Sequence, residues 1–590
     1  LPGRQVLIAP VSLDRPIVDQ RGSPGYDPNY NYYATISAGS AAAKMEIAHL
    51  ILRGGGIYLE GHHNHVHHVR IEARGSSSPA LEINSTANVL GAPRGGPAAA
   101  PGQRDLGRAL VENVVIDGYS DSYGIEIDRA DSAIIRNNQV LRDSIGIYPY
   151  CGSPAAIAVY DVNYSEVRNN VITNAECIGI DVQHDAGRAV VSRNRVTGAA
   201  AAGIQVSAPV IALDHNAVRD IGTGSLLYSG YARGIDVTTN YAVVSLTSLG
   251  DSVIGSDYIG FSAIAAIATI DSLVVDTTGR DSSYGGYGLA IQDGHYTVRH
   301  SHISNTFRGD GINGCTQVRT TIMSIGNRVS NPGYNGINVG DCSESSNQPD
   351  TLISVHDTVA VANIGIYASY FSYVRVDSAD LSGRGIQYNG GVHVNGGRLV
   401  VRDSRIRGFA DAVAAYSGER TVEIRRNTFI ANGNGLYLSG PTDSVVIVGN
   451  TIDSSSRTGV EMWYGTRARV DSNLIRWSGV SGILLQNLSG QAVIRGNTVD
   501  STATDAILLA SDASARVDSN VVRASGSVGI HLQYFTGSTV IRGNSITGAG
   551  SHGLDLRALS DTAFVIDNTL NFSGGDGIAV EYSPIRADSN

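Results

Sequence analysis

The amino-acid sequence predicts an all-β fold, a long parallel β-helix whose rungs of about 23 residues stack into a solenoid. Three features that return once per rung predict it: an asparagine, an aliphatic residue shortly before it, and a glycine that opens a short apolar run. Solenoid repeats bury their apolar faces only against their neighbours, so a fixed period over a long chain is their signature. In the clearest part the asparagines are 22 to 24 residues apart, and they are Asn427, Asn450, Asn473, Asn497, Asn520, Asn544, Asn568 and Asn590.

Each feature has a physical role within one rung. Val470 stands three residues before Asn473, and the next short strand reads Gly482 followed by Ile483-Leu484-Leu485. Side chains alternate along a strand, so the first and third of these apolar residues are expected inside. We expect the glycine to supply a turn conformation that a Cβ would oppose. We interpret the asparagines as a structural ladder, in which each amide bonds the next asparagine and nearby backbone.

This pattern resembles the parallel β-helix repeat of the pectin-lyase-like superfamily, over about residues 45–590. The resemblance implies a right-handed single-stranded parallel β-helix in an extracellular or cell-surface protein, often one that meets polysaccharide. It implies no single activity, because the same fold serves lyases, hydrolases, epimerases, tailspikes and adhesins.

Loop content divides the predicted solenoid into three parts. Residues 1–45 do not follow the repeat and are expected to start or cap the coil. Residues 46–415 form an irregular β-helix with long loops, and residues 416–590 continue it as a regular stem. Loops of a solenoid tend to build its binding face, so we expect any site within 46–415.

The charge and the hydropathy of the chain exclude two classes of function. A net charge of −11 argues against nucleic-acid binding, which requires a basic face. No run approaches 18 apolar residues, so no membrane-spanning segment is predicted.

Four cysteines fall in two pairs, Cys151 with Cys177 and Cys315 with Cys342, at intervals of 26 and 27 residues. Each interval is about one rung, and rungs about 4.8 Å apart suit a disulfide if the side chains face each other. Two such disulfides would indicate an oxidising, extracytoplasmic location. Four buried free thiols are the alternative.

Charged residues in the stem predict two columns of alternating sign. One column reads Asp471, Arg495, Asp518 and Arg542, and the other reads Asp453, Arg476, Asp500 and Arg523. Opposite charges on neighbouring strands stabilise a sheet by roughly 0.2–1 kcal/mol per pair. We therefore predict two ion ladders on the solvent face.

Acidic residues recur at the outward position that follows successive glycines in the looped part. They are Glu126, Asp181 and Asp236, with Gln205 between the last two and His184 in a nearby turn. In pectate-lyase-like enzymes such a column holds calcium and a catalytic base, and paired carboxylates also hydrolyse glycosides. The resemblance therefore makes Glu126, Asp181, His184 and Asp236 candidate catalytic residues, with Ca²⁺ as the candidate cofactor. Solvation of a strand face is the alternative.

Two aromatic groups complete the set of candidates. Tyr228, Tyr231, Tyr284 and Tyr287 lie in or beside predicted loops and are candidate ligand contacts, because tyrosine rings suit sugar stacking; packing onto the coil is the alternative. The tract from His62 to His68 looks like a metal tract, but strand alternation would divide its side chains between two faces. We predict no metal site there.

These observations favour a secreted or cell-surface β-helical rod with a structural or adhesive role, which contacts polysaccharide or associates with itself into a homo-oligomer or filament. An extracellular polysaccharide lyase, epimerase or glycoside hydrolase that acts on the outer face of the looped half is the first alternative. A phage-type tailspike is the second.

Overall fold

The computed structural model describes residues 6–8, 17–19, 36–38, 44–53, 55–61, 63–72, 79–84, 107–118, 123–141, 154–184, 187–222, 232–238, 243–279, 285–341, 350–369, 373–385, 390–441 and 443–590. Its regular elements in these ranges are all β-strands, from β1 (Val6–Ile8) to β63 (Ile585–Asp588), which confirms the all-β prediction. None of the described segments is a helix long and apolar enough to cross a membrane. Contacts between residues divide the chain into two units, Leu1–Gly309 and Asp310–Asn590.

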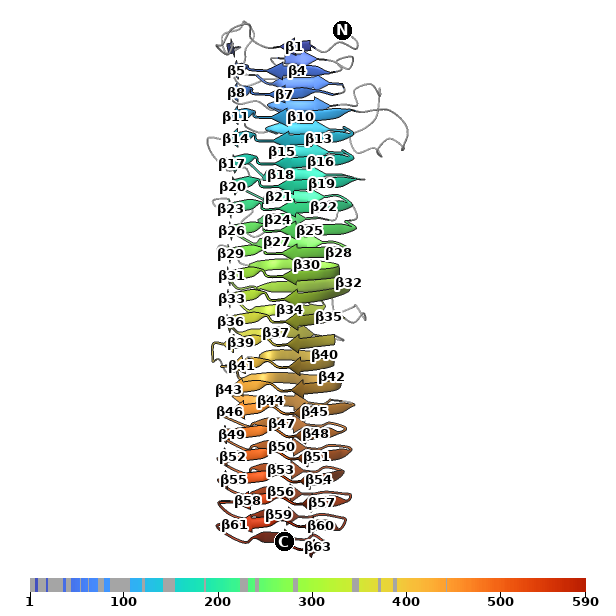
Figure 1. Ribbon diagram of the computed structural model, residues 1–590, viewed down its shortest axis with the longest axis vertical. Coiled ribbons are helices and arrows are strands. Elements are labelled where there is room, and N and C mark those ends of the chain that lie inside the picture. Colours follow the sequence, from blue (N-terminus) through green and yellow to red (C-terminus); the bar gives the residue numbers. More distant parts are fainter. Residues whose placement is uncertain are drawn as a thin grey trace. The chain divides into compact units, whose positions relative to one another are not determined.

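Three strands make one rung of the first unit. A representative rung holds β15 (Ala155–Tyr160), β16 (Tyr164–Arg168) and β17 (Val171–Ala175), and the next holds β18 (Ile178–Gln183), β19 (Arg188–Ser192) and β20 (Arg195–Ala199). Each strand of one rung pairs in parallel with the corresponding strand of the next. Figure 1 shows the resulting columns of strands, which confirm the predicted parallel solenoid.

The second unit repeats this plan. There, β47 (Val460–Trp463), β48 (Ala468–Asp471) and β49 (Leu474–Ser478) pair in parallel with β50 (Ile483–Gln486), β51 (Gln491–Arg495) and β52 (Thr498–Thr502). In β40 (Gly390–Arg402) and β42 (Asp411–Arg425) the first two strands of a rung run on as one.

Columns of aliphatic side chains fill the interior of each unit. Strand register places corresponding residues of successive rungs directly above one another, so each column is continuous. Full burial of one such side chain contributes about 1.5–3 kcal/mol. Each of the following is 0% exposed: Ile157, Ile180, Ile204 and Ile235 in the first unit, and Ile447, Val470, Ile494 and Val517 in the second.

The eight asparagines that the repeat singles out form one hydrogen-bonded column in the second unit. The Nδ2 of Asn473 donates to Oδ1 of Asn497 at 2.9 Å, and its backbone N–H donates to the same oxygen at 3.0 Å. Its Nδ2 also donates to the carbonyl of Ile447 at 2.9 Å. The pattern runs from Asn427 through to Asn590.

A second column of this kind stands in the first unit, where Asn138, Asn170, Asn194 and Asn216 end on Asp251. In both columns the residue before each ladder side chain has a left-handed backbone, as in Ser472 (φ 56°) and Asn169 (φ 54°). The ladder side chain therefore follows a sharp bend in the chain. We call the left-handed residue just before it the bend position.

The repeated glycines serve a different purpose from the one predicted. Gly482 is not in a left-handed conformation; a Cβ there would lie 2.3 Å from Cγ1 of Val499 and 2.7 Å from the carbonyl oxygen of Ala506. Gly459 and Gly529 meet the same two obstacles, an aliphatic side chain and the next rung's carbonyl. Close approach of backbone to core requires these glycines, so the turn-conformation explanation was wrong.

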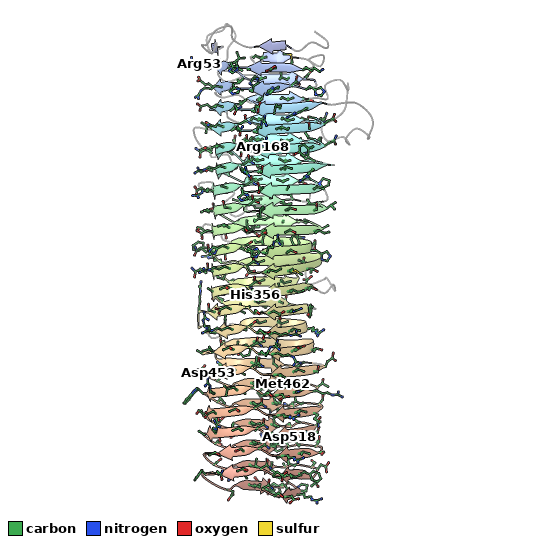
Figure 2. All side chains as sticks on the ribbon, in the orientation of Figure 1. Arg53, Arg168, His356, Asp453, Met462 and Asp518 are labelled. Carbon is green, nitrogen blue, oxygen red and sulfur yellow. The ribbon has the colours of Figure 1, made fainter. Side chains whose placement is uncertain are left out.

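The two predicted charge columns have the expected register, and the second column has an ion pair across one rung at one of its steps. Arg476 donates to Asp453 across one rung at 2.6 Å; Asp453 is labelled in Figure 2. Asp471 stands opposite Arg495 but is ion-paired with Arg469 of its own strand. Residues i and i+2 share one face of a strand, so Arg469 lies close enough to bind the Asp471 carboxylate in place of Arg495. The same correction applies to Asp518, which is paired with Arg516.

We predict that Asn473→Ala destabilises the second unit. The change removes three amide hydrogen bonds donated by a side chain that is 2% exposed, one of them to the Ile447 carbonyl. We expect a loss of about 1–3 kcal/mol in the free energy of unfolding, measured by urea denaturation. Asn571→Ala, at an exposed asparagine, is the control. Equal losses in the two variants would contradict a structural role for the ladder.

We predict a pH-dependent gain of stability from Asp251→Asn. Burial raises the pKa of Asp251 to about 6, against the hydrogen bonds from Ser248 and Asn216. Between about pH 4 and 6 the folded chain thus holds a proton that the unfolded chain releases, so this group's contribution to stability falls as the pH rises. The asparagine of Asp251→Asn cannot ionise, so the variant should not lose stability over this pH range. Relative to wild type, we expect its free energy of unfolding to be higher by on the order of 2 kcal/mol at pH 7 and little changed at pH 4.

Thermal and urea unfolding at pH 4 and pH 7 measure this effect. Asp443→Asn, at an exposed aspartate, is the control and should change neither value. A variant that is destabilised equally at both pH values would show that Asp251 is charged in the folded protein.

Candidate functional site

The acidic residues predicted as catalytic do share one outward column of the first unit. Glu126 of β12 (Ile125–Asp128) stands opposite Ala158, which stands opposite Asp181 of β18. Gln205 of β21 (Ala202–Ser207) lies between Asp181 and Asp236 of β24 (Arg233–Val237). The carboxylates are therefore two rungs, or about 10 Å, apart.

Asp181 is sealed beneath neighbouring side chains. It is 0% exposed, and it accepts hydrogen bonds from the Tyr160 hydroxyl at 2.9 Å and from Nε2 of Gln183 at 3.0 Å. Burial raises the pKa of Asp181 to about 6, while these two donors oppose the rise. The Tyr123 ring packs edge to face on Tyr160, with centroids 6.1 Å apart. In this conformation Asp181 offers no surface to a substrate.

The other predicted catalytic residues are also held by the fold. His184 is 0% exposed, with Nε2 at 2.7 Å from the Ser165 hydroxyl and Nδ1 at 2.8 Å from the Gln183 carbonyl. Asp236 is 6% exposed and paired with Arg233 at 2.9 Å; burial raises its pKa and Arg233 opposes that rise. Glu126 is likewise 6% exposed. Their catalytic roles stay predictions.

Three of the four predicted tyrosine contacts, Tyr228, Tyr231 and Tyr284, lie outside the described residues. Tyr287 opens β30 (Tyr287–Arg299) and packs edge to face with Tyr258 at 6.1 Å between centroids, as in the packing alternative.

The cysteine pairings also stay predictions. No described cysteine is a free thiol, and Cys177 is 1% exposed. Cys151, Cys342 and the side chain of Cys315 lie outside the described part of the chain.

A row of aromatic rings runs along the outer face of the second unit. It consists of Tyr367 in β37 (Ile364–Ser369), His393 in β40, Tyr416 in β42 and Tyr437 in β44 (Asn434–Ser439), and we call it the aromatic stripe. Successive ring centroids are 5.3, 4.9 and 5.6 Å apart, one ring per rung. All four side chains are partly exposed. Burial lowers the pKa of His393 and raises that of Tyr416 and Tyr437.

Register explains how the stripe stays unbroken. Ala414 occupies the outward position between His393 and Tyr437, and Tyr416, two residues further on, fills the gap. Tyr367 stands opposite His393 in the same outward column. The signal that could have found the stripe is the aromatic residue two positions after the glycines at 365, 391 and 435.

Carboxylates flank the stripe. Asp411 accepts a hydrogen bond from Nδ2 of Asn434 at 2.8 Å, and burial raises its pKa. Glu461 continues the outward column after Tyr437 and accepts from Nε1 of Trp463 at 2.7 Å. Partly exposed rings beside carboxylates are suited to a ligand with apolar faces and many hydroxyl donors.

The histidine tract is not divided as predicted. His65 and His67 share the outward face of β7 (His65–His67), and His68 lies at the following bend beside them. Among the described residues, the groups whose ligand atoms converge as a metal would require are His49, His67 and His68, and Glu46, His65 and His67. The Glu126, Asp181 and Asp236 column is in neither group.

Comparison with known families agrees with the fold. The family described as "Right handed beta helix region" matches residues 31–242 and 458–590, more than half of the chain, so this protein belongs to that family. This membership confirms the predicted right-handed parallel β-helix. No curated protein matches the chain. A family described as "Periplasmic copper-binding protein (NosD)" matches residues 350–501.

In the described part of 350–501, no three His, Cys, Asp or Glu side chains bring their ligand atoms together. Among solved structures, the chain is similar to a PL6 family alginate lyase, AlyGC, at 10% identity, over 100% of this chain and 97% of that one. The TM-score of 0.21 is too low to support an argument from that likeness.

We predict that all four cysteines are oxidised in protein isolated from an oxidising compartment. Denatured, unreduced protein treated with iodoacetamide should gain no label at Cys151, Cys177, Cys315 or Cys342 by mass spectrometry, and reduction should expose all four. Peptide mapping should find the two rung-to-rung pairs. Labelling before reduction would favour the buried-thiol alternative.

Proposed function

We propose that this protein is an extracytoplasmic β-helical binding protein, structural or adhesive in role, that holds a polysaccharide along the aromatic stripe of its second unit. The observation that carries the proposal is the row of four rings spaced 4.9–5.6 Å apart on the outer face. An extended glycan that runs along the stack would meet one ring at each rung.

The chemistry of the stripe supports a sugar ligand. The rings are tilted against one another by 30–48° and are partly exposed, so a glycan along the stack would meet apolar ring edges and polar ring atoms at each rung. The flanking Asp411 and Glu461 accept hydrogen bonds, and in an anionic chain of net charge −11 they favour a neutral, hydroxyl-rich glycan over a uronate polymer.

The burial of the first unit's acidic column favours binding over catalysis. A glycosidase needs two carboxyl groups that reach the substrate, and Asp181 is 0% exposed while Glu126 and Asp236 are 6% exposed. An extracytoplasmic location is supported by the predicted disulfides and by the match to a family described as periplasmic. Self-association stays a prediction from the sequence.

We predict that Tyr416→Ala and Tyr437→Ala each weaken glycan binding by roughly three- to tenfold, because each removes one stacking ring. Affinity gel electrophoresis against a panel of neutral and uronate polysaccharides, followed by calorimetry with the best ligand, measures this. Tyr534→Ala is the matched control. Tyr534 is 61% exposed, and the residues at the same position in the neighbouring rungs are Ser511 and Ala558, so it is not part of a row of rings.

Retarded migration that the two stripe variants share with wild type would place the glycan elsewhere on the surface. A preference for uronate polymers that survives these substitutions would do the same. Release of reducing or unsaturated sugars, lost in Asp181→Ala, would favour the enzymatic alternative.

A further inference from the structure

Two bend histidines of consecutive rungs stack on each other near the start of the first unit. His49 follows β4 (Met45–Ala48) and His68 follows β7, and these two strands pair in parallel with Ala48 opposite His67. Both histidines have a left-handed backbone, with φ of 58° and 53°. Their rings lie nearly parallel, at 17°, with centroids 5.1 Å apart.

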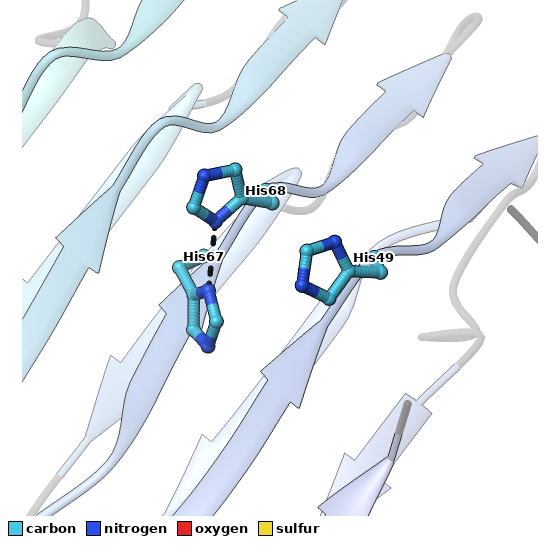
Figure 3. Close-up of side chains that lie close together, drawn as sticks. All are labelled: His49, His67 and His68. Atoms are coloured by element: carbon cyan, nitrogen blue, oxygen red, sulfur yellow. Dashed lines mark hydrogen bonds between the residues drawn. The ribbon is translucent and has the colours of Figure 1, made fainter. Parts of the chain in front are cut away.

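A third imidazole reaches the same point from the strand (Figure 3). His67 points outward from β7, and its Nδ1 lies 2.8 Å from Nδ1 of His68. Its ring meets that of His49 edge to face, with centroids 5.7 Å apart. One ligand nitrogen from each of the three side chains lies within 4.8 Å of the others.

A carboxylate sets the tautomer of the central ring. Oε1 of Glu46 lies 3.0 Å from Nε2 of His67, so this nitrogen donates its proton to Glu46 and Nδ1 keeps its lone pair. His68 then supplies the proton of the 2.8 Å contact from its own Nδ1. A carboxylate behind a ligating imidazole is the usual second partner at zinc sites.

We propose that His49, His67 and His68 bind a divalent transition-metal ion of the zinc type, which cross-links the first two bends of the described coil. Nitrogens that are each about 2.0–2.1 Å from a tetrahedral ion lie about 3.3 Å apart, so the His67–His68 contact must open by roughly half an ångström. His68 keeps one proton by moving it from Nδ1 to Nε2, so both rings stay neutral. His49 is exposed, and water completes the coordination.

Bend histidines alone do not make this site. His356 occupies the same bend position in the second unit, with φ of 56°, but the bend residues of its neighbouring rungs are Gly326 and Ser378. What distinguishes His49 and His68 is a second histidine one rung away and a third on the adjoining strand. His356 is therefore a matched control.

Calorimetric titration of the full, EDTA-dialysed chain with Zn²⁺ tests the proposal. We expect about one ion per chain for wild type and for His356→Asn, and at least tenfold weaker binding for His49→Asn and His68→Asn. Asparagine tolerates the left-handed backbone, and circular dichroism checks the fold of each variant. Glu46→Gln should bind less than tenfold more weakly, because the amide oxygen still accepts from His67. Co²⁺ should give the strong visible absorption of a tetrahedral site in wild type, and Ca²⁺ should not compete.

Three results would overturn the proposal. Wild type that binds no Zn²⁺ at micromolar concentration and gives no tetrahedral Co²⁺ spectrum has no such site. Loss of binding in Glu46→Gln but not in His49→Asn would assign the ion to Glu46, His65 and His67 instead. An equal loss in His356→Asn would mark the binding as adventitious.

Discussion

In-register parallel stacking is the constraint on which the rest of each unit depends. Backbone N–H and C=O groups of a parallel strand are satisfied only by the strands above and below, so equivalent residues of successive rungs must lie over one another. Ile180 therefore stands on Ile157 and under Ile204, and no rung can change its inward residues alone. The glycines obey the same constraint, since a Cβ at Gly482 would strike the next rung's carbonyl.

Stacking places the bends of successive rungs in one column, in which two adjacent residues have different roles. The ladder side chains, such as Asn473 and Asn497, satisfy buried backbone that would otherwise be unpaired at each turn. The residue just before each of them is left-handed and directed away from the core, so its identity is free to vary. Most rungs place asparagine, serine, glycine or arginine there, and the first rungs place histidines. When two consecutive rungs both carry histidine at the bend position, as His49 and His68 do, their side chains lie close enough to act together as metal ligands.

Stacking of neighbouring rungs also explains why the outer faces of the two units differ in exposure. In the first unit, the column of Glu126, Asp181 and Asp236 is covered by its own partners, and burial raises the pKa of the two aspartates. In the second unit, the corresponding column carries Tyr367, His393 and Tyr437, whose rings stack and remain partly exposed. Whether an outward side chain can contact a ligand thus depends less on its own residue type than on the residues one rung away and on how much of the side chain is exposed to solvent.

The sequence by itself determined the period, and with it the parallel coil, the interior aliphatic columns and the asparagine ladder, because these features depend on residues that return at nearly constant intervals. It also predicted the register of Asp471 with Arg495, but not that Arg469 would take the carboxylate. Only the tertiary structure decided such contacts. Contacts between residues two positions out of register, as between Glu46 and His67 or between Tyr416 and Tyr437, do not follow from spacing along the chain. Spacing also does not tell whether a neighbour covers a side chain. Strand pairing settles the first point and side-chain packing the second, and both are properties of the folded coil.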